Sequence, residues 1–288
     1  MRLILGVMWL LHWLPLPILG RLGEWTGSFL FMVLRSRRHI TLTNLRLCLP
    51  HLSEAQRVAL ARQHFQAYAR SVLERGILWW APEARLRKLI VIEPRVPMEA
   101  IQSGPTILLC PHFVCLDVAG VALVLESPAC SIYTSQRNLV FDQALRKGRT
   151  RFHPVKLLSR GEGVKPILRA MREGLPFFML PDMDFGAKDA AFVPFFGIPA
   201  ATLTAPARIA AAVNAKVIPV VGTFLPDYRG WKVTFYAQWD NFPGDDIVAA
   251  TRRMNEFIET RALETPSEYF WTHKRFKTRP EGARSVYD

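Results

Sequence analysis

The sequence predicts an α/β fold in which a mixed, largely parallel sheet is flanked by helices. Short apolar runs, several rich in β-branched or aromatic residues, alternate with longer segments of helical periodicity. This alternation favours parallel strands joined by crossover helices. The expected strands cover residues 89–92, 106–110, 131–134, 177–180, 216–221 and 231–237. The expected intervening and following helices cover residues 114–125, 139–149, 163–172, 203–213 and 246–263.

A further helix is predicted to begin at Ser53, before the first expected strand. Ser53 and Gln56 have the spacing of a capping box, and apolar positions continue at helical spacing to Gly76. At 288 residues the chain is long enough for one large domain or two small ones. Its four cysteines stand in apolar surroundings without a regular spacing, so we expect reduced thiols and no disulfide framework.

The net charge is +13, and half of the residues are hydrophobic. Such a basic protein suits an acidic partner, which could be nucleic acid, anionic lipid or an acidic protein. Residues 3–20 carry no formal charge and include Trp9 and Trp13, residue types that favour a membrane interface. This stretch favours a membrane and argues against nucleic acid. Its modest length and its prolines, Pro15 and Pro17, leave a spanning helix and an interfacial helix both open.

An arginine run at residues 35–38 follows the apolar N-terminal region. Only Arg2 precedes the uncharged stretch at residues 3–20. The positive-inside rule then places most of the chain in the cytoplasm, where the arginines can also hold anionic headgroups. We therefore expect a membrane-anchoring segment with an anchor helix at residues 1–35 and one soluble domain at residues 36–288. An ordinary solvated basic turn is the alternative interpretation of the arginine run.

The most informative pair is His112 and Asp117, at the predicted junction between a buried strand and a helix. In open α/β sheets, ligands gather at the carboxyl ends of the strands. A carboxylate one turn into the helix can accept a hydrogen bond from one imidazole nitrogen and leave the other free to take a proton. The pair therefore predicts a general base with its orienting carboxylate, although an accidental spacing remains the alternative.

A second polar loop follows the predicted strand at residues 177–180. Asp182 and Asp184 are expected to position an arginine or a substrate hydroxyl there, and turn formation is the alternative role. The apolar stretch 192–199 after this loop either lines a tunnel for a chain-like ligand or belongs to the core. Arg149 and Arg151 lie in a basic segment at the end of a predicted helix, where guanidinium groups can bind phosphate.

Two other chemistries use residues near His112. Cys110, His112, Cys115 and Cys130 could bind zinc, but paired metal-ligand spacing is absent from the sequence. Cys115 could be a nucleophile activated by His112. The glycines Gly161 and Gly163 match neither nucleotide-binding spacing, so we expect no cofactor. Because paired metal-ligand spacing is absent and the loop of Asp182 and Asp184 offers too few oxygen ligands, we also expect no metal.

Four segments together resemble the late acyltransferases of lipid A biosynthesis. These are Cys-Pro-His112-Phe-Val-Cys-Leu-Asp117, Gly148-Arg-Thr-Arg151, Pro181-Asp-Met-Asp-Phe-Gly186 with Phe192-Val-Pro-Phe-Phe196, and Val217-Ile-Pro-Val-Val221. The first segment has the His-x4-Asp/Glu motif of the wider glycerolipid acyltransferase group. The Pro-Asp-x-Asp form is characteristic of the lipid A branch. Several members of that branch carry Glu where this chain has Asp117.

The resemblance implies a glycerolipid acyltransferase-like fold and an enzyme of the cell inner membrane with its catalytic domain on the cytoplasmic face. It implies transfer of a fatty acyl group from acyl carrier protein thioester to a hydroxyl on an acyl chain of a lipid A precursor. His112 would be the general base and Asp117 its partner. Arg149, with Arg151 as a neighbour, would bind substrate phosphate, and Asp182 would hold that arginine or a sugar hydroxyl.

Two alternatives remain at the level of the sequence. The same catalysis could use another membrane acceptor, such as a lysophospholipid or a glycolipid. A membrane-docking protein without catalytic activity would also explain the anchor and the basic charge, but it would not explain a histidine at the end of a buried strand.

Overall fold

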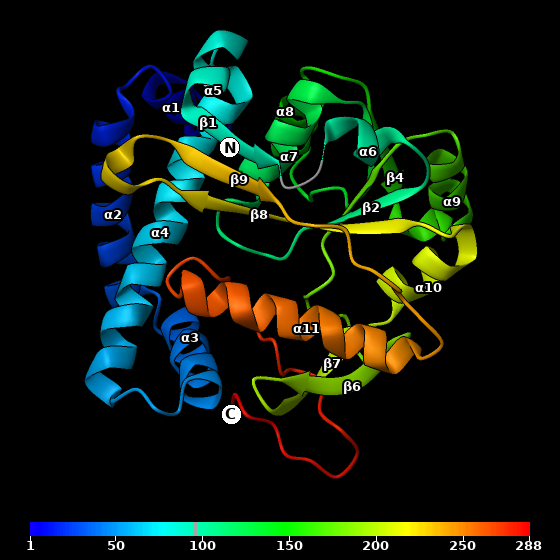
Figure 1. Cartoon of the computed structure of the whole chain (residues 1–288). Coiled ribbons are helices and arrows are strands. Elements are labelled where there is room, and N and C mark those ends of the chain that lie inside the picture. Colours follow the sequence, from blue (N-terminus) through cyan, green and yellow to red (C-terminus); the bar gives the residue numbers. More distant parts are fainter. Residues whose placement is uncertain (95–96) are drawn as a thin grey trace.

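The computed structural model describes residues 1–94 and 97–288, which form a seven-stranded sheet with helices on both faces (Figure 1). The strand order is β1-β9-β8-β2-β5-β3-β4. Neighbouring strands pair in parallel except β8 and β9, which form an antiparallel pair. The α/β prediction with a mixed, largely parallel sheet is therefore confirmed. The strands are β1 (Ile90–Pro94), β2 (Thr106–Leu109), β3 (Ala129–Tyr133), β4 (Val155–Ser159), β5 (Phe177–Met179), β8 (Lys216–Phe224) and β9 (Trp231–Phe235).

Helices cover both faces of the sheet. Successive side chains of a strand point to opposite faces, so each strand contributes to the core on either side. Leu108 of β2 packs into a core shared with α4 and α7, whereas its neighbours Ile107 and Leu109 pack into a core shared with α9, α10 and α11. Both faces of the central strands are therefore buried, as expected for parallel strands. The helices are α1 (Arg2–Leu11), α2 (Leu16–Val33), α3 (Arg35–Cys48), α4 (Glu54–Trp80), α5 (Glu83–Leu89), α6 (Met98–Gln102), α7 (Leu116–Glu126), α8 (Leu139–Arg149), α9 (Lys165–Arg172), α10 (Ala205–Val213) and α11 (Ile247–Glu264).

Several local predictions agree closely with the structure. Helix α8 has the predicted bounds, and the predicted capping box of Ser53 and Gln56 opens α4 with both reciprocal hydrogen bonds. Strand β4 and helices α3 and α5 were not among the predicted elements. The apolar stretch 192–199 forms most of an antiparallel hairpin of β6 (Ala190–Phe195) and β7 (Ile198–Leu203), outside the main sheet.

The apolar N-terminal stretch is divided into two helices. Proline disfavours a helical conformation in the residue before it and lacks an N–H, and Pro15 accordingly stands between α1 and α2. Helix α2 lies against α4 through buried glycines: an added Cβ at Gly23 would lie 2.5 Å from the Cα atom of Arg70. Within the described residues, we find no helix with both the length and the apolarity required to cross a bilayer.

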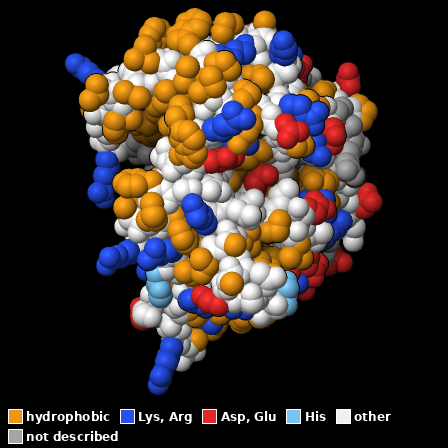
Figure 2. All heavy atoms as spheres, turned by 90° about the vertical axis from the view of Figure 1, so that its left-hand side faces the viewer, with side chains coloured by type: hydrophobic (Ala, Val, Ile, Leu, Met, Phe, Trp, Pro, Cys, Tyr) orange, Lys and Arg blue, Asp and Glu red, His pale blue; other side chains and the backbone are white. Residues whose placement is uncertain are grey.

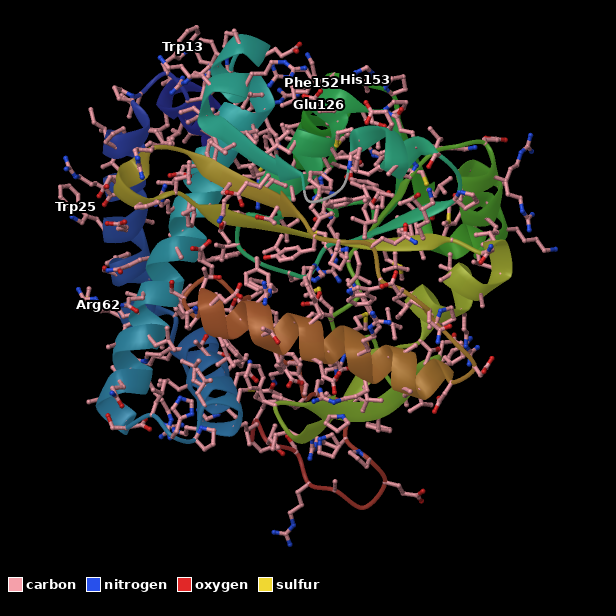
Figure 3. All side chains as sticks on the ribbon, viewed as in Figure 1. Trp13, Trp25, Arg62, Glu126, Phe152 and His153 are labelled. Carbon is pink, nitrogen blue, oxygen red and sulfur yellow. The ribbon has the colours of Figure 1, made fainter. Side chains whose placement is uncertain are left out.

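The outward faces of α1 and α2 are apolar. Leu3 is 81% exposed, Trp13 62% and Trp25 71%. Figure 2 shows hydrophobic side chains gathered on the face that these helices form, with basic side chains at its border. Figure 3 places Trp13 and Trp25 at the outer edge of the molecule. We call this surface, made by the exposed apolar residues of residues 1–34, the apolar N-terminal face.

Candidate active site

The site lies at the carboxyl ends of β2 and β5, which are adjacent parallel strands. Each strand is followed closely by a candidate catalytic side chain, His112 after β2 and Asp182 after β5. The Nδ1 atom of His112 lies 2.6 Å from Oδ1 of Asp182, and the backbone N–H of His112 donates to both carboxylate oxygens at 3.1 Å. A donor hydrogen bond from Nδ1 fixes the neutral tautomer in which Nε2 is the proton acceptor.

Asp182 is buried, with 2% of its surface exposed. Burial by itself raises the pKa of this carboxyl, but the attraction and hydrogen bonds of His112 outweigh burial and lower it below its usual value. Asp182 is thus an ionised hydrogen-bond acceptor at neutral pH. This arrangement differs from the predicted role of Asp182, which was to hold an arginine or a sugar hydroxyl.

The sequence predicted His112 as the partner of Asp117, but in the structure Asp117 is paired with two arginines. It lies in the first turn of α7, where its two carboxylate oxygens contact Nε of Arg75 at 2.8 Å and Nη2 of Arg149 at 2.9 Å. Burial opposes ionisation, but the two arginines outweigh it and hold the pKa of Asp117 at about 2. The carboxylate beside His112 comes from the neighbouring strand instead, because parallel strands bring their ends to one edge of the sheet. Arg75, on α4, was not singled out by any sequence pattern.

The remaining predicted substrate-binding residues hold backbone groups. Asp184 accepts hydrogen bonds from the backbone N–H of Thr278 at 2.6 Å, from its hydroxyl at 2.7 Å, and from the N–H of Gly186 at 2.9 Å. Arg151 donates to the carbonyl oxygens of Leu78 and Ala81 at 2.8 and 2.7 Å. These contacts fix the loop after β5 and the end of α4.

The backbone of the His112 loop is held by a segment far along the chain, residues 265–287, which we call the C-terminal strap. The carbonyl of His112 accepts from the N–H of Phe270 at 3.0 Å, and Val114 donates to the carbonyl of Glu268 at 2.8 Å. The ring of Phe270 is stacked near the imidazole, with 6.4 Å between the ring centroids. The strap also reaches α3, where the amide of Asn44 donates to two of its carbonyl groups.

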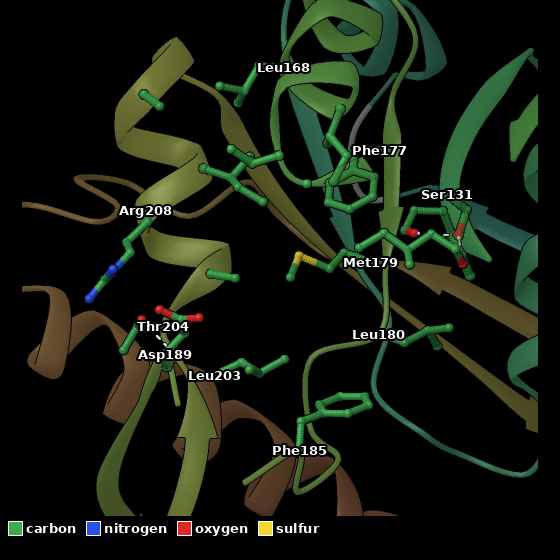
Figure 4. A pocket seen from close by; sticks show the side chains of 18 of the residues that line it. Ser131, Leu168, Phe177, Met179, Leu180, Phe185, Asp189, Leu203, Thr204 and Arg208 are labelled. Atoms are coloured by element: carbon green, nitrogen blue, oxygen red, sulfur yellow. Dashed lines mark hydrogen bonds between the residues drawn. The ribbon is translucent and has the colours of Figure 1, made fainter. Parts of the chain in front are cut away.

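A cavity of about 590 Å³ has His112 among its lining residues. Figure 4 shows side chains that line this cavity, among them Phe177, Met179 and Arg208. Its walls come mainly from apolar side chains of β5, α9 and α10, and Lys188 and Arg208 contribute positive charge. We call it the large cavity. The stretch 192–199, predicted to line a tunnel or to lie in the core, does not contribute to this lining among the described residues. Phe195 of that stretch is fully buried and packs on Tyr269 and Phe276.

The structure does not support a zinc site or a nucleophilic Cys115 near His112 in the part of the chain that it describes. Cys115 is buried, and burial raises the pKa of its thiol well above the usual value, which disfavours the nucleophilic thiolate. Across residues 1–94 and 97–288, His, Cys, Asp and Glu side chains form no group of three or more arranged to hold a metal ion.

Comparison with known proteins shows the family to which the chain belongs. The model of the bacterial lipid A biosynthesis acyltransferases matches residues 1–278. The chain belongs to this family. It is 29% identical over 286 residues to the lipid A biosynthesis palmitoleoyltransferase of Escherichia coli strain K12, covering 98% of this chain and 92% of that protein. It is 30% identical over 287 residues to the lauroyltransferase of the same strain, covering 98% and 93%.

The myristoyltransferase of that strain is also similar, with 30% identity over 285 residues, 94% of this chain and 83% of that protein. Among solved structures, the 1-acyl-sn-glycerophosphate acyltransferase of Thermotoga maritima aligns with a TM-score of 0.38 and 13% identity, covering 86% of this chain and 96% of that one. The family member described here is a late acyltransferase of lipid A biosynthesis, with an acyl donor and a lipid A precursor as its substrates.

Proposed function

We propose that this lipid A acyltransferase uses acyl carrier protein thioester as donor and a hydroxyl on an acyl chain of the lipid A precursor as acceptor, with His112 as general base. The observation that carries the proposal is the buried Asp182 carboxylate on Nδ1 of His112, at the edge of the large cavity. This pair holds Nε2 as the acceptor for a proton. A carrier protein that is acidic suits the net charge of +13.

The reaction needs one base and no covalent enzyme intermediate. Nε2 of His112 takes the proton of the acceptor hydroxyl as its oxygen bonds to the thioester carbonyl carbon. The tetrahedral intermediate then collapses, its C–S bond breaks, and the imidazolium returns the proton to the departing thiolate. Asp182 stabilises the imidazolium between these steps. The acyl chain of the donor occupies the large cavity, whose apolar wall matches a hydrocarbon chain.

Arg149 and Arg75 form the phosphate-binding part of this proposal. Asp117 balances only one of the two positive charges, and the side chain of Arg149 remains 34% exposed, so a guanidinium is available to an anionic group. Asp117 therefore acts as a positioning residue for the two arginines. Asp184 and Arg151 support the surrounding backbone.

The proposed location is the cytoplasmic face of the cell inner membrane, with residues 1–35 docking on the bilayer and residues 36–288 carrying the catalytic machinery. The glycine contacts bury one side of α2 against α4, and the apolar N-terminal face is left outward. An apolar helix face bordered by arginines suits insertion into the headgroup region of anionic lipids.

The test is mass spectrometry of a sugar-modified tetra-acylated lipid A precursor after incubation with acyl carrier protein thioesters. Wild-type protein should add the mass of one acyl group, and His112→Ala should lose that activity. His153→Ala is a matched control because His153 is exposed and lies outside the site. A parallel incubation with a lysophospholipid and a glycolipid examines the alternative acceptors. Transfer to one of those and none to the lipid A precursor would overturn the proposal.

A further inference from the structure

A second cavity, of about 60 Å³, lies on the other face of the sheet from the large cavity. Its apolar wall comes from α4, α7, β3 and β4, whereas the large cavity is bounded by α9 and α10. Asp117 and Arg149 are among its lining residues. We call it the small cavity. Ser131, Phe178 and Leu180 line both cavities and form the wall between them.

The proposed reaction brings two hydrocarbon chains to one point. The hydroxyl-bearing carbon of the acceptor continues into the rest of its acyl chain, and the thioester carbonyl continues into the chain being transferred. The ester product therefore branches at the reacting oxygen, and its two chains must leave that point along different paths. Two apolar cavities that meet at a shared wall give each chain a path of its own.

We propose that the small cavity binds the acceptor chain immediately beyond its hydroxyl group, while the large cavity holds the transferred chain; this inference rests on the proposed function. Arg149 lines the small cavity, so the phosphate and the acyl chain of the acceptor are held on one side of the sheet. His112 lines the large cavity, and its partner Asp182 follows Leu180, which lines both cavities, by two residues. The base thus lies where the acceptor hydroxyl meets the donor carbonyl.

The sizes of the cavities agree with this division. A group the size of a water molecule needs about 10–15 Å³ of cavity volume. The small cavity, at about 60 Å³, therefore admits roughly four to six methylene groups, which is a short part of an acyl chain. The remainder of the acceptor chain stays outside the cavity. The large cavity, at about 590 Å³, has the capacity for a much longer chain segment.

Gly120 provides a direct test because it lines the small cavity and is helical. A Cβ atom added there would meet only ordinary contacts, with the nearest atom of Phe178 at 3.9 Å. Gly120→Leu therefore fills the cavity without straining the backbone, and Gly120→Ala is the matched control. Val124→Phe fills the same cavity from the next turn of α7 and repeats the test if Gly120→Leu does not fold.

The assay compares two acceptors with identical sugars and phosphates, one with full-length hydroxyacyl chains and one with chains truncated just after the hydroxyl-bearing carbon. We expect Gly120→Leu to lower kcat/KM for the full-length acceptor by about tenfold or more. The kcat/KM for the truncated acceptor should stay at the wild-type value. Its preference among donor thioesters should equal that of the wild type. Ala205→Leu, in the wall of the large cavity, should change donor preference instead.

Equal loss with both acceptors, a changed donor preference, or wild-type kinetics in Gly120→Leu would each overturn the cavity assignment while the wild-type activity still stands. A failure of the proposed function has a different signature, because the wild-type protein itself would then transfer no acyl group to either acceptor. In that case the cavity assignment falls with the proposed function.

Discussion

Asp182→Asn should reduce turnover strongly while preserving the size and shape of the side chain. The carboxylate accepts from the backbone N–H of His112 with both oxygens at 3.1 Å and faces Nδ1 of the same residue at 2.6 Å. An amide retains one acceptor oxygen and places an NH₂ donor where the other oxygen stood. Either the NH₂ group replaces one of the two oxygens that accept from the backbone N–H and places a donor against that N–H, or Nδ1 becomes the acceptor and Nε2 carries the proton. The second outcome removes the base.

The expected loss in kcat lies in the ~10²- to 10⁴-fold range typical of positioned acid/base groups. Leaving a buried hydrogen-bonding group without its partner should also lower the free energy of unfolding by about 1–3 kcal/mol. Asp184→Asn is the matched control, because Asp184 is buried in the same loop but contacts Thr278 and Gly186. That substitution should affect stability with little change in kcat.

The measurement is kcat for acyl transfer at saturating acceptor, with urea unfolding of each variant. If Asp182→Asn turns over within a few fold of the wild type while folded, the assignment of Asp182 as the orienting carboxylate is refuted. An equal loss of kcat in Asp184→Asn would show that the loop conformation, and not the pair with His112, carries the effect.

Three further outcomes follow from packing, charge and the apolar surface. Gly27→Ala should lower the free energy of unfolding by about 1–3 kcal/mol in urea titrations, because its Cβ would lie 2.3 Å from a backbone oxygen of α4; Gly6→Ala, with open space around it, should not. Burial raises the pKa of Glu268 to about 7 from 4.5, so the folded state retains a proton that the unfolded state releases, and stability should fall by up to about 3 kcal/mol as pH rises from 4.5 to 7. Between pH 4.5 and 7, the thermal unfolding temperature of Glu268→Gln should depend less on pH than that of the wild type. The same pH dependence in both proteins would contradict the raised pKa of Glu268. Trp25→Ser should weaken sedimentation with anionic vesicles several-fold, whereas Leu263→Ser, also on an exposed apolar residue, should behave as wild type; equal binding by both would argue against docking through the apolar N-terminal face.

The sequence predicted the fold class well because its strongest signals are local. Alternating apolar runs and helical segments depend on neighbours a few residues apart, and so does the capping box at Ser53. Strand β4 was missed because it lies at the sheet edge and is only partly buried, so its sequence lacks a continuous apolar run. The position of His112 at a strand end was predicted for the same local reason.

The partner of His112 was not predictable from its neighbours in sequence. Asp182 reaches it because β2 and β5 are adjacent, and strand order depends on tertiary packing. A usable signal did exist: both residues closely follow apolar strands, and the carboxyl ends of parallel strands share an edge. Arg75 gave no such signal, since its contact with Asp117 depends on how α4 packs against α7.

The C-terminal strap has a consequence for how the enzyme is made. The backbone groups of His112 and Val114 bond to residues that are translated long after β2 and α7. On the ribosome, the catalytic loop therefore lacks these bonds until the strap has emerged from the exit tunnel. Under the proposed membrane docking, a nascent chain that already exposes its apolar N-terminal helices can reach a bilayer before the His112 loop has all of its hydrogen bonds. We therefore expect docking to precede catalysis, with acyl transfer beginning only after synthesis has passed the strap.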